Sequence, residues 1–154
     1  MRTVIMLAFL ALATALPAAA APIAGLHGLV GTWKCTYRTG AAHLAYDAVY
    51  AYDLPDQVLR QTDTWAGGGA EESVAYDAQR HGWTAIVFDG QGSATVMHAP
   101  GSDPNHIVYR SVYPDAGIAV TFDRLSATTY VLHGTVHAGG KTITSLDTCL
   151  RAAG

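Results

Sequence analysis

The stretch that decides the fold runs from Gly25 to Gly40 and reads GLHGLVGTWKCTYRTG. A glycine-rich lead-in is followed by Gly31-Thr32-Trp33 and then by β-prone residues that include Cys35, one of two cysteines in the chain. Thr, Trp and Tyr fit the pleated, half-buried surface of a strand. The first strand is therefore predicted at Thr32–Arg38, with a large Trp and a rare Cys on it.

The N-terminal residues have the features of a secretory signal peptide. Arg2 provides a positive charge, the segment Val4–Leu16 is apolar, and small residues follow Pro17. The apolar segment is shorter than the roughly 20 residues that a membrane-spanning helix needs. We expect residues 1–20 to be removed and residues 21–154 to form one domain. The mature protein is then secreted or periplasmic, with no membrane span.

Charge and length limit the partners of this protein. The chain has 154 residues and a formal net charge of −3, and its only lysines, Lys34 and Lys141, lie outside any basic cluster. Binding to nucleic acid or to an anionic membrane surface depends on clustered Lys and Arg, so neither is expected. The abundance of Ala and Gly favours a bacterial source. The sequence predicts no oligomeric state.

Past Gly31, short β-prone runs alternate with turn signals, and no stretch has a helical apolar period. Runs spaced by roughly 8–12 residues are typical of an all-β sandwich or barrel, and short connections favour antiparallel hairpins. About ten runs follow this pattern. They are Thr32–Arg38, His43–Tyr52, Gln57–Trp65, Glu71–Tyr76, Trp83–Phe88, Ser93–His98, His106–Tyr113, Ile118–Asp123, Thr129–Val136 and Lys141–Leu150.

The two cysteines, Cys35 and Cys149, lie in the first and the last of these runs. In an exported protein, two cysteines most simply form a disulfide. A disulfide needs Cα atoms within about 7 Å, so the first and last strands must be neighbours. A meander whose ends pair in this way is a closed barrel without exposed edges.

An antiparallel disulfide pair also predicts the register of the closing strands. If the number of strands is even, Trp33 lies opposite Arg151 on one face of the sheet. On the same face, Tyr37 lies opposite Asp147. Trp33 and Arg151 are then expected to form a cation–π pair at one end of the barrel. Tyr37 and Asp147 are expected to form a hydrogen bond.

Gly31-Thr32-Trp33 on the first strand resembles the G-x-W signature of the lipocalin and calycin superfamily. In that superfamily the Trp packs across the base of the barrel against a basic residue near the end of the domain, and Arg151 matches that residue. The resemblance implies a single antiparallel up-and-down β-barrel of about 8–10 strands. Lipocalins have about eight strands, whereas fatty-acid-binding proteins and the haem barrel nitrobindin have about ten, so the branch stays open.

The resemblance further implies a cup that holds a small lipophilic molecule. Such a pocket needs an aliphatic and aromatic lining with a few polar groups, although the same residues could instead fill a core. Arg60 and Arg110 are the residues that could clamp a carboxylate inside the cup. Trp33 and Arg151 are expected to be structural. The candidate ligand-binding residues are Tyr37, Tyr46, Tyr50, Arg60, Tyr76, Arg110, Phe122 and Tyr130.

The seven histidines of the chain give little support to a metal site. His133 and His137 share one face of a strand but lie about 13 Å apart along it. No Cys and His motif with metal-ligand spacing is present, so no metal is expected. No cofactor is expected either. A haem held by one axial His is the alternative, with His98 or His106 as its ligand.

Nucleophilic catalysis is not indicated, because no G-x-S-x-G motif is present and both cysteines are expected in the disulfide. Glu71 and Glu72 alternate faces of a strand, so they do not share a site. The sequence favours an exported protein that binds a small apolar or amphipathic molecule without catalysis. The alternatives are a barrel enzyme, either haem-binding or a cofactor-free isomerase or cyclase, and a structural or partner-binding barrel with a filled interior.

Overall fold

The computed structural model describes residues 22–54 and 56–153, and the expected signal peptide, residues 1–20, lies outside the described residues. A 3₁₀ helix, η1 (Pro22–Leu29), precedes ten strands. They are β1 (Gly31–Thr39), β2 (Ala42–Leu54), β3 (Val58–Trp65), β4 (Gly68–Asp77), β5 (Gly82–Phe88), β6 (Ala94–Pro100), β7 (His106–Tyr113), β8 (Ile118–Arg124), β9 (Thr129–Ala138) and β10 (Lys141–Arg151).

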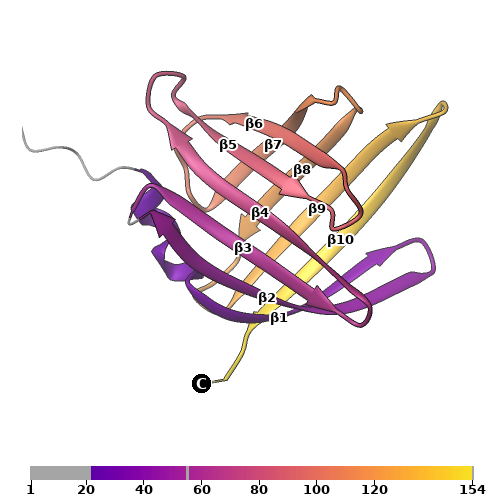
Figure 1. The fold of residues 1–154 in the computed structure, drawn as a ribbon, viewed down its shortest axis with the longest axis horizontal. Coiled ribbons are helices and arrows are strands. Elements are labelled where there is room, and N and C mark those ends of the chain that lie inside the picture. Colours follow the sequence, from indigo (N-terminus) through magenta and orange to yellow (C-terminus); the bar gives the residue numbers. More distant parts are fainter. Residues whose placement is uncertain (1–21, 55, 154) are drawn as a thin grey trace, which may run out of the picture.

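The strands form one closed antiparallel barrel (Figure 1). Each strand pairs with the next along the chain, and β10 pairs with β1. The predicted all-β meander and its closure are confirmed, and the number of strands is ten. Within the described ranges, no helix has the length and apolar character to cross a bilayer.

The strand bounds differ from the predicted runs most clearly at the glycines 67–69. These glycines read as one turn, but β4 begins at Gly68, and of the three only Gly67, with φ at 88°, has a left-handed backbone. A Cβ on Gly69 would lie 2.7 Å from the carbonyl oxygen of Asp63. The missing side chain therefore allows β3 and β4 to approach closely at this point.

The disulfide Cys35–Cys149 joins β1 to β10, as predicted. In the register of this strand pair, Trp33 lies opposite Arg151. Tyr37 likewise lies opposite Asp147. Both cysteines are buried. The bond therefore fixes the strand pair that closes the barrel, and it holds the first and the last strand together.

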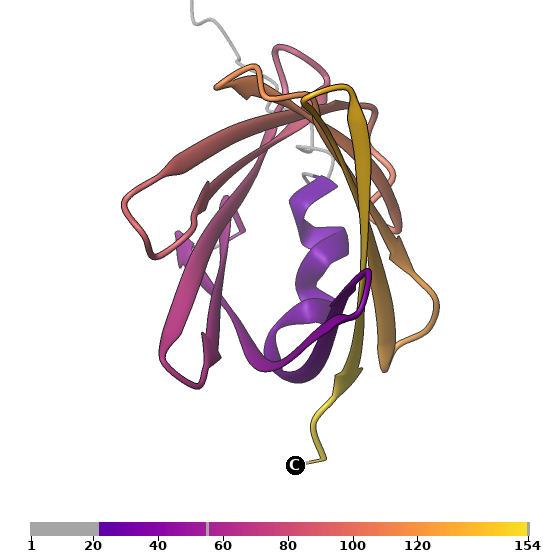
Figure 2. The same ribbon diagram turned by 90° about the vertical axis from the view of Figure 1, so that its right-hand side faces the viewer.

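The helix η1 closes one end of the barrel and was not predicted from the glycine-rich sequence. Figure 2 shows η1 within the outline of the barrel. Its residues Ile23, Leu26 and Leu29 are buried, with exposed fractions of 3% or less. Residues three apart lie above one another in a 3₁₀ helix, so these side chains form one apolar face. Their spacing was the signal in the sequence.

Trp33 and Arg151 hold the C-terminal turn of η1. Trp33 Nε1 donates a hydrogen bond to the carbonyl oxygen of Leu29 at 2.7 Å. The guanidinium of Arg151 lies 4.6 Å from the ring centre of Trp33, which confirms the predicted cation–π pair. The same guanidinium donates to the carbonyl oxygens of Gly28 and Val30. The pair thus satisfies carbonyl groups that a helix end leaves without partners.

Two more strands fasten η1 to the barrel. Tyr52 Oη on β2 donates to the carbonyl oxygen of Ile23 at 3.0 Å. Arg124 Nη1 at the end of β8 donates to the carbonyl oxygen of Gly25 at 3.1 Å. Side chains from β1, β2, β8 and β10 therefore bind the backbone of η1, which fixes its position as a plug.

Aromatic side chains fill the barrel next to η1. Tyr130 is fully buried, and its ring meets the ring of Trp33 edge-on with centroids 4.9 Å apart. Tyr50 Oη donates a hydrogen bond to Tyr130 Oη at 2.8 Å, so the buried hydroxyl group of Tyr50 has a partner inside the core. The hydrophobic core of the molecule therefore lies at the η1 end.

Removal of the disulfide is expected to destabilise the barrel strongly. The two cysteines are 114 residues apart, so the double variant Cys35→Ala/Cys149→Ala should lose about 4–5 kcal/mol of unfolding free energy in the chain-entropy model. Urea denaturation followed by Trp fluorescence measures the loss. A loss below about 1 kcal/mol would show that strand pairing alone holds the barrel closed.

Replacement of Trp33 by Ala is expected to lower the free energy of unfolding by about 3–5 kcal/mol, because its large side chain is buried against η1. Thermal denaturation followed by circular dichroism measures the change. Val49→Ala on β2, where the side chain is exposed, is the control and should have little effect. Equal stability of the two variants would contradict the role of Trp33.

Candidate functional site

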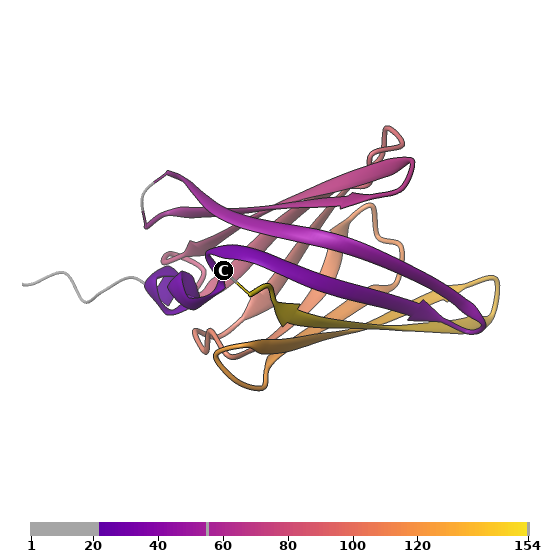
Figure 3. The same ribbon diagram turned by 90° about the horizontal axis from the view of Figure 1, so that it is seen from below.

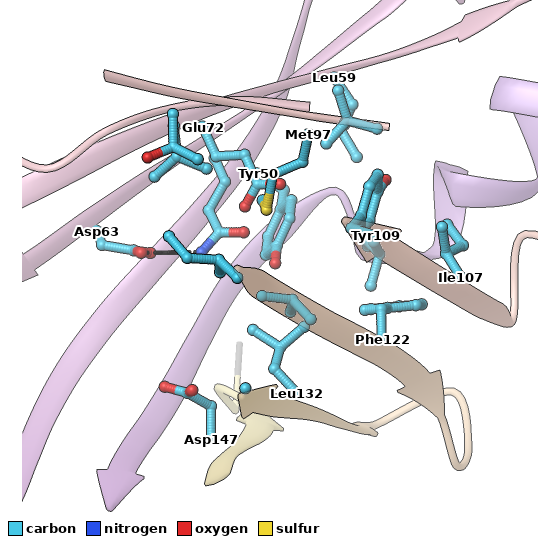
Figure 4. Close-up of a pocket in the computed structure, with 18 of the residues that line it drawn as sticks. Tyr50, Leu59, Asp63, Glu72, Met97, Ile107, Tyr109, Phe122, Leu132 and Asp147 are labelled. Carbon is cyan, nitrogen blue, oxygen red and sulfur yellow. Dashed lines mark hydrogen bonds between the residues drawn. The ribbon is translucent and has the colours of Figure 1, made fainter. Parts of the chain in front are cut away.

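The barrel encloses a cavity of about 320 Å³ between η1 and the opposite end of the barrel. Residues from η1 and from every strand except β1 line it (Figure 4). Pockets that bind small molecules have volumes of roughly 300–1,000 Å³, so this cavity lies at the lower limit of that range. The aromatic core next to η1 therefore fills only part of the interior.

One side of the cavity is apolar. Strands β5 to β9 contribute it, and we refer to it as the apolar wall. Inward and outward positions alternate along a strand, so each strand presents between one and three apolar side chains to the cavity. The apolar wall consists of Val87, Met97, Ile107, Ile118, Val120, Phe122 and Leu132.

The other side of the cavity carries carboxylates. The acidic wall consists of Gln61 and Asp63 on β3, Glu72 on β4 and Asp147 on β10. Gln61 lies directly opposite Glu72 in the β3–β4 register, and Asp63 is the next inward residue of β3. Figure 4 shows Asp63 and Glu72 on the side of the cavity away from Ile107. Among the residues that the structure describes, none that lines the cavity is Lys, Arg or His.

Two of the three carboxylates accept hydrogen bonds from neighbouring side chains. Gln61 Nε2 donates to both carboxylate oxygens of Asp63, at 2.8 and 2.9 Å. Tyr46 Oη donates to Oδ1 of Asp147 at 2.8 Å. Glu72 faces the cavity and accepts no hydrogen bond from any described side chain or backbone group. Glu72 is therefore the carboxylate of the acidic wall without a donor.

Burial raises the pKa values of the acidic wall. The pKa of Glu72 rises from its ordinary value of 4.5 to about 7, first because of burial and then because of the negative charge of Asp63. Burial also raises the pKa of Asp63 to about 6, although the hydrogen bond from Gln61 opposes this. The pKa of Asp147 is raised by burial as well. The charge of the acidic wall therefore changes near neutral pH.

A second, smaller cavity of about 220 Å³ lies at the end of the barrel opposite η1. We refer to it as the vestibule. Tyr37, Leu44 and Trp65 line it, and it shares Tyr46, Asp63 and Asp147 with the main cavity. In Figure 3, the β1–β2 and β9–β10 hairpins extend at this end, away from η1. The shared residues place the acidic wall between the vestibule and the apolar wall.

Four of the predicted ligand-binding residues line these two cavities. Tyr46, Tyr50 and Phe122 line the main cavity, and Tyr37 and Tyr46 line the vestibule. The predicted hydrogen bond from Tyr37 to Asp147 is wrong. The residue that donates to Asp147 is Tyr46 on β2. Tyr37 keeps its position opposite Asp147, but its side chain faces the vestibule.

Two predicted aromatic residues lie in the core instead. Tyr130 is buried between Trp33 and Tyr50 and lines neither cavity. Tyr76 packs edge-on against Trp83, with ring centroids 5.1 Å apart. Both rings therefore pack in or against the hydrophobic core and do not form part of the cavity surface.

Arg60 and Arg110 lie on the outer face of the barrel, so the expected carboxylate clamp does not form. On β3 the inward positions are Leu59 and Gln61, which turns Arg60 outward, where its Nη2 lies 3.2 Å from Oδ1 of Asp53. On β7 the inward neighbour is Tyr109, which turns Arg110 outward. Strand alternation accounts for both corrections.

The two candidate haem ligands also face outward. Met97 and Ala99 are the buried positions of β6, so His98 between them points to the outer face. His106 is exposed, and its Nδ1 lies 2.6 Å from Oδ1 of Asp123. Neither histidine lines either cavity. Within residues 22–54 and 56–153, no group of three or more His, Cys, Asp or Glu is placed to hold a metal ion.

The acidic wall was not predicted as a site, although the sequence held a signal for it. Glu71 and Glu72 were correctly expected on opposite faces, and the closing register already placed Asp147 on the inward face with Trp33. The β3 run has apolar residues on both faces, so its inward face could not be chosen. Once Leu59 is known to point inward, Asp63 must do so as well.

No protein-family model and no curated protein matches this sequence. Among solved structures, the chain is similar to the S-type phycobiliprotein lyase CPES from Guillardia theta. The TM-score is 0.52 at 14% sequence identity, covering 85% of this chain and 92% of that chain. At this identity the likeness shows the fold alone. The chain is therefore a closed ten-stranded antiparallel β-barrel with a fold similar to that of this lyase, and its interior contains a cavity with one apolar and one acidic wall.

The raised pKa of Glu72 predicts that Glu72→Gln stabilises the protein at about pH 8. Between 4.5 and about 7, the folded protein keeps a proton that the unfolded chain has lost, so the stability of the wild type falls as pH rises through this window. A neutral Gln removes this contribution and should raise the free energy of unfolding by about 1–3 kcal/mol above the window.

Urea denaturation at about pH 4 and about pH 8 tests this prediction. Glu71→Gln is the matched control, because Glu71 is the exposed neighbour of Glu72 on β4 and should change stability little at either pH. Part of the pH dependence should persist in Glu72→Gln, since the pKa of Asp63 is also raised. A Glu72→Gln variant that is less stable than the wild type at the higher pH would contradict the assignment.

Proposed function

We propose that this protein is an exported carrier that binds a small amphipathic molecule inside the barrel and does not convert it chemically. The observation that carries the proposal is the cavity of about 320 Å³ with its apolar wall on β5–β9 and its acidic wall on β3, β4 and β10. A filled structural barrel needs no such cavity, and an apolar ligand alone needs no acidic wall.

Export is supported by two independent features. The N-terminal sequence with Arg2 and the apolar segment Val4–Leu16 has the pattern of a signal peptide. The disulfide Cys35–Cys149 is of the kind that persists in oxidising compartments, which include the periplasm and the extracellular space. We therefore place the mature protein outside the cytoplasm, as a secreted or periplasmic protein.

Membership in the calycin superfamily is part of this proposal. It rests on Gly31-Thr32-Trp33 at the start of β1 and on the contact between Trp33 and Arg151. The likeness in fold to a phycobiliprotein lyase is consistent with it. The barrel of that superfamily is a cup for small molecules, which matches the site proposed here.

A cofactor-free proton-transfer enzyme is the second candidate. It is favoured by Glu72 and Asp63, whose pKa values of about 7 and about 6 suit a general acid or base near neutral pH. The two candidates differ in the fate of the ligand. After incubation in D₂O, a carrier returns its ligand with no deuterium on carbon, whereas an isomerase that acts through a carbanion introduces it.

Binding of the neutral fluorescent probe N-phenyl-1-naphthylamine tests the carrier function. The probe should become fluorescent in the cavity of the wild type. Leu132→Trp adds volume to the apolar wall and should weaken probe binding at least about tenfold.

Val131→Trp is the matched control, because Val131 is the adjacent residue of β9 on the opposite face of the sheet and does not line the cavity. Circular dichroism confirms that each variant is folded. Equal probe binding by the wild type, Leu132→Trp and Val131→Trp would place the probe on the surface and contradict the proposed function.

A further inference from the structure

Within the described residues, the carboxylates of the cavity have no cationic partner. Asp63, Glu72 and Asp147 all line the main cavity, while none of the described residues that line the cavity or the vestibule is Lys, Arg or His. Arg124 and Arg151 donate to the carbonyl oxygens of Gly25 and Gly28 in η1 instead. A carboxylate removed from bulk water is costly in its charged form unless it is paired. At a pH at which these groups are ionised, a cation from outside the chain would therefore stabilise the acidic wall.

Glu72 is the strongest indication of such a partner. The amide of Gln61 donates hydrogen bonds to Asp63, and the hydroxyl of Tyr46 donates one to Asp147, but no described group donates to Glu72. Its side chain lines the cavity, where a bound molecule can reach it. An acceptor that faces a cavity without a protein donor is available to a ligand with N–H groups or positive charge.

The vestibule adds aromatic rings to the carboxylates. Tyr37 and Trp65 line it together with Asp63 and Asp147. Cations are attracted to the faces of Trp and Tyr rings, most strongly where water is excluded. A positively charged group that enters through the vestibule therefore meets aromatic rings first and the acidic wall next.

A metal ion does not fit this arrangement. In the part of the chain that the structure describes, no three carboxylates or histidines are close enough to one another to coordinate one ion. The acidic groups are distributed over β3, β4 and β10, which suits a larger cation whose charge several carboxylates can share. The apolar wall opposite them then accommodates its hydrocarbon part.

We propose that the ligand is an organic cation, an amine or a quaternary ammonium with an apolar body, whose charged group binds between Asp63, Glu72 and Asp147. This inference rests on the proposed carrier function and names the chemical class of its ligand. The apolar body lies against Phe122 and Leu132. The acidic wall repels an anionic ligand of the same shape, and a neutral ligand leaves the negative charge of the acidic wall without a partner.

The proposal predicts how affinity changes with pH. The titratable groups that interact electrostatically with Glu72 are Asp63 on β3, Tyr50 on β2, Tyr109 on β7 and Tyr130 on β9. Burial raises the pKa values of the three tyrosines, so they stay neutral near pH 7. Of these groups and Glu72, only the carboxylates then change charge between about pH 5 and about pH 8, and a permanent cation should bind more tightly as they ionise.

Calorimetric titration with three probes that share one alkyl chain tests the ligand class. The probes are decyltrimethylammonium, 1-decanol and decanoate. At about pH 8 the wild type should bind the ammonium at least about tenfold more tightly than the alcohol, and decanoate most weakly. The ammonium affinity should fall as the pH is lowered to about 5, since Glu72 and Asp63 become protonated.

Glu72→Gln and Glu71→Gln form a matched pair of variants. Glu72→Gln should reduce the ratio of ammonium to alcohol affinity about tenfold and flatten its pH dependence. Glu71→Gln removes the same charge from the outer face of β4 and should leave both unchanged. Asp147→Asn is a second test from another strand and should reduce the ratio as well.

The outcomes separate this inference from the function on which it rests. Equal binding of all three probes, or preference for decanoate, overturns the cationic ligand and leaves the carrier intact. If Glu72→Gln and Glu71→Gln change the ratio of ammonium to alcohol affinity equally, the cationic ligand is also overturned. The effect would then come from the net charge of the protein and not from a carboxylate in the cavity. If none of the three probes binds, the ligand class is overturned. If N-phenyl-1-naphthylamine does not bind either, the carrier function is overturned as well.

Discussion

A covalent bond between β1 and β10 sets the register of the strand pair that closes the barrel. The register places Trp33 opposite Arg151 at one end, where both hold η1 as a plug. It also places Asp147 on the inner surface, where Tyr46 binds it. The closed end and part of the acidic wall thus depend on the same bond, since a shift by one residue would turn these side chains outward.

Closure at one end leaves a cavity that extends from η1 toward the opposite end of the barrel. The aromatic core around Tyr130 occupies part of the space next to η1, Leu26 and Leu29 line the cavity there, and the vestibule lies at the opposite end. The strands then divide the cavity, with carboxylates on β3, β4 and β10 and aliphatic or aromatic residues on β5–β9. An interior divided in this way favours an amphipathic guest in one orientation.

The sequence predicted the parts of the fold that depend on local pattern and on one long-range bond. The alternation of residues predicted the ten strands. The two cysteines predicted that the first and last strands pair, and that Arg151 lies opposite Trp33. Arg60 and Arg110 were misplaced because their strands have apolar residues on both faces, so periodicity does not identify the inner one. The pKa shift of Glu72 depends on neighbours from other strands, which no local pattern contains.

Native mass spectrometry with an absorption spectrum, on protein exported and purified without denaturant, tests the central claim most directly. The account predicts a noncovalent adduct of metabolite size, basic in character, that is lost in Leu132→Trp, with no visible haem band. Bare protein mass in every preparation, or an adduct that Leu132→Trp retains, would contradict a ligand held in the cavity.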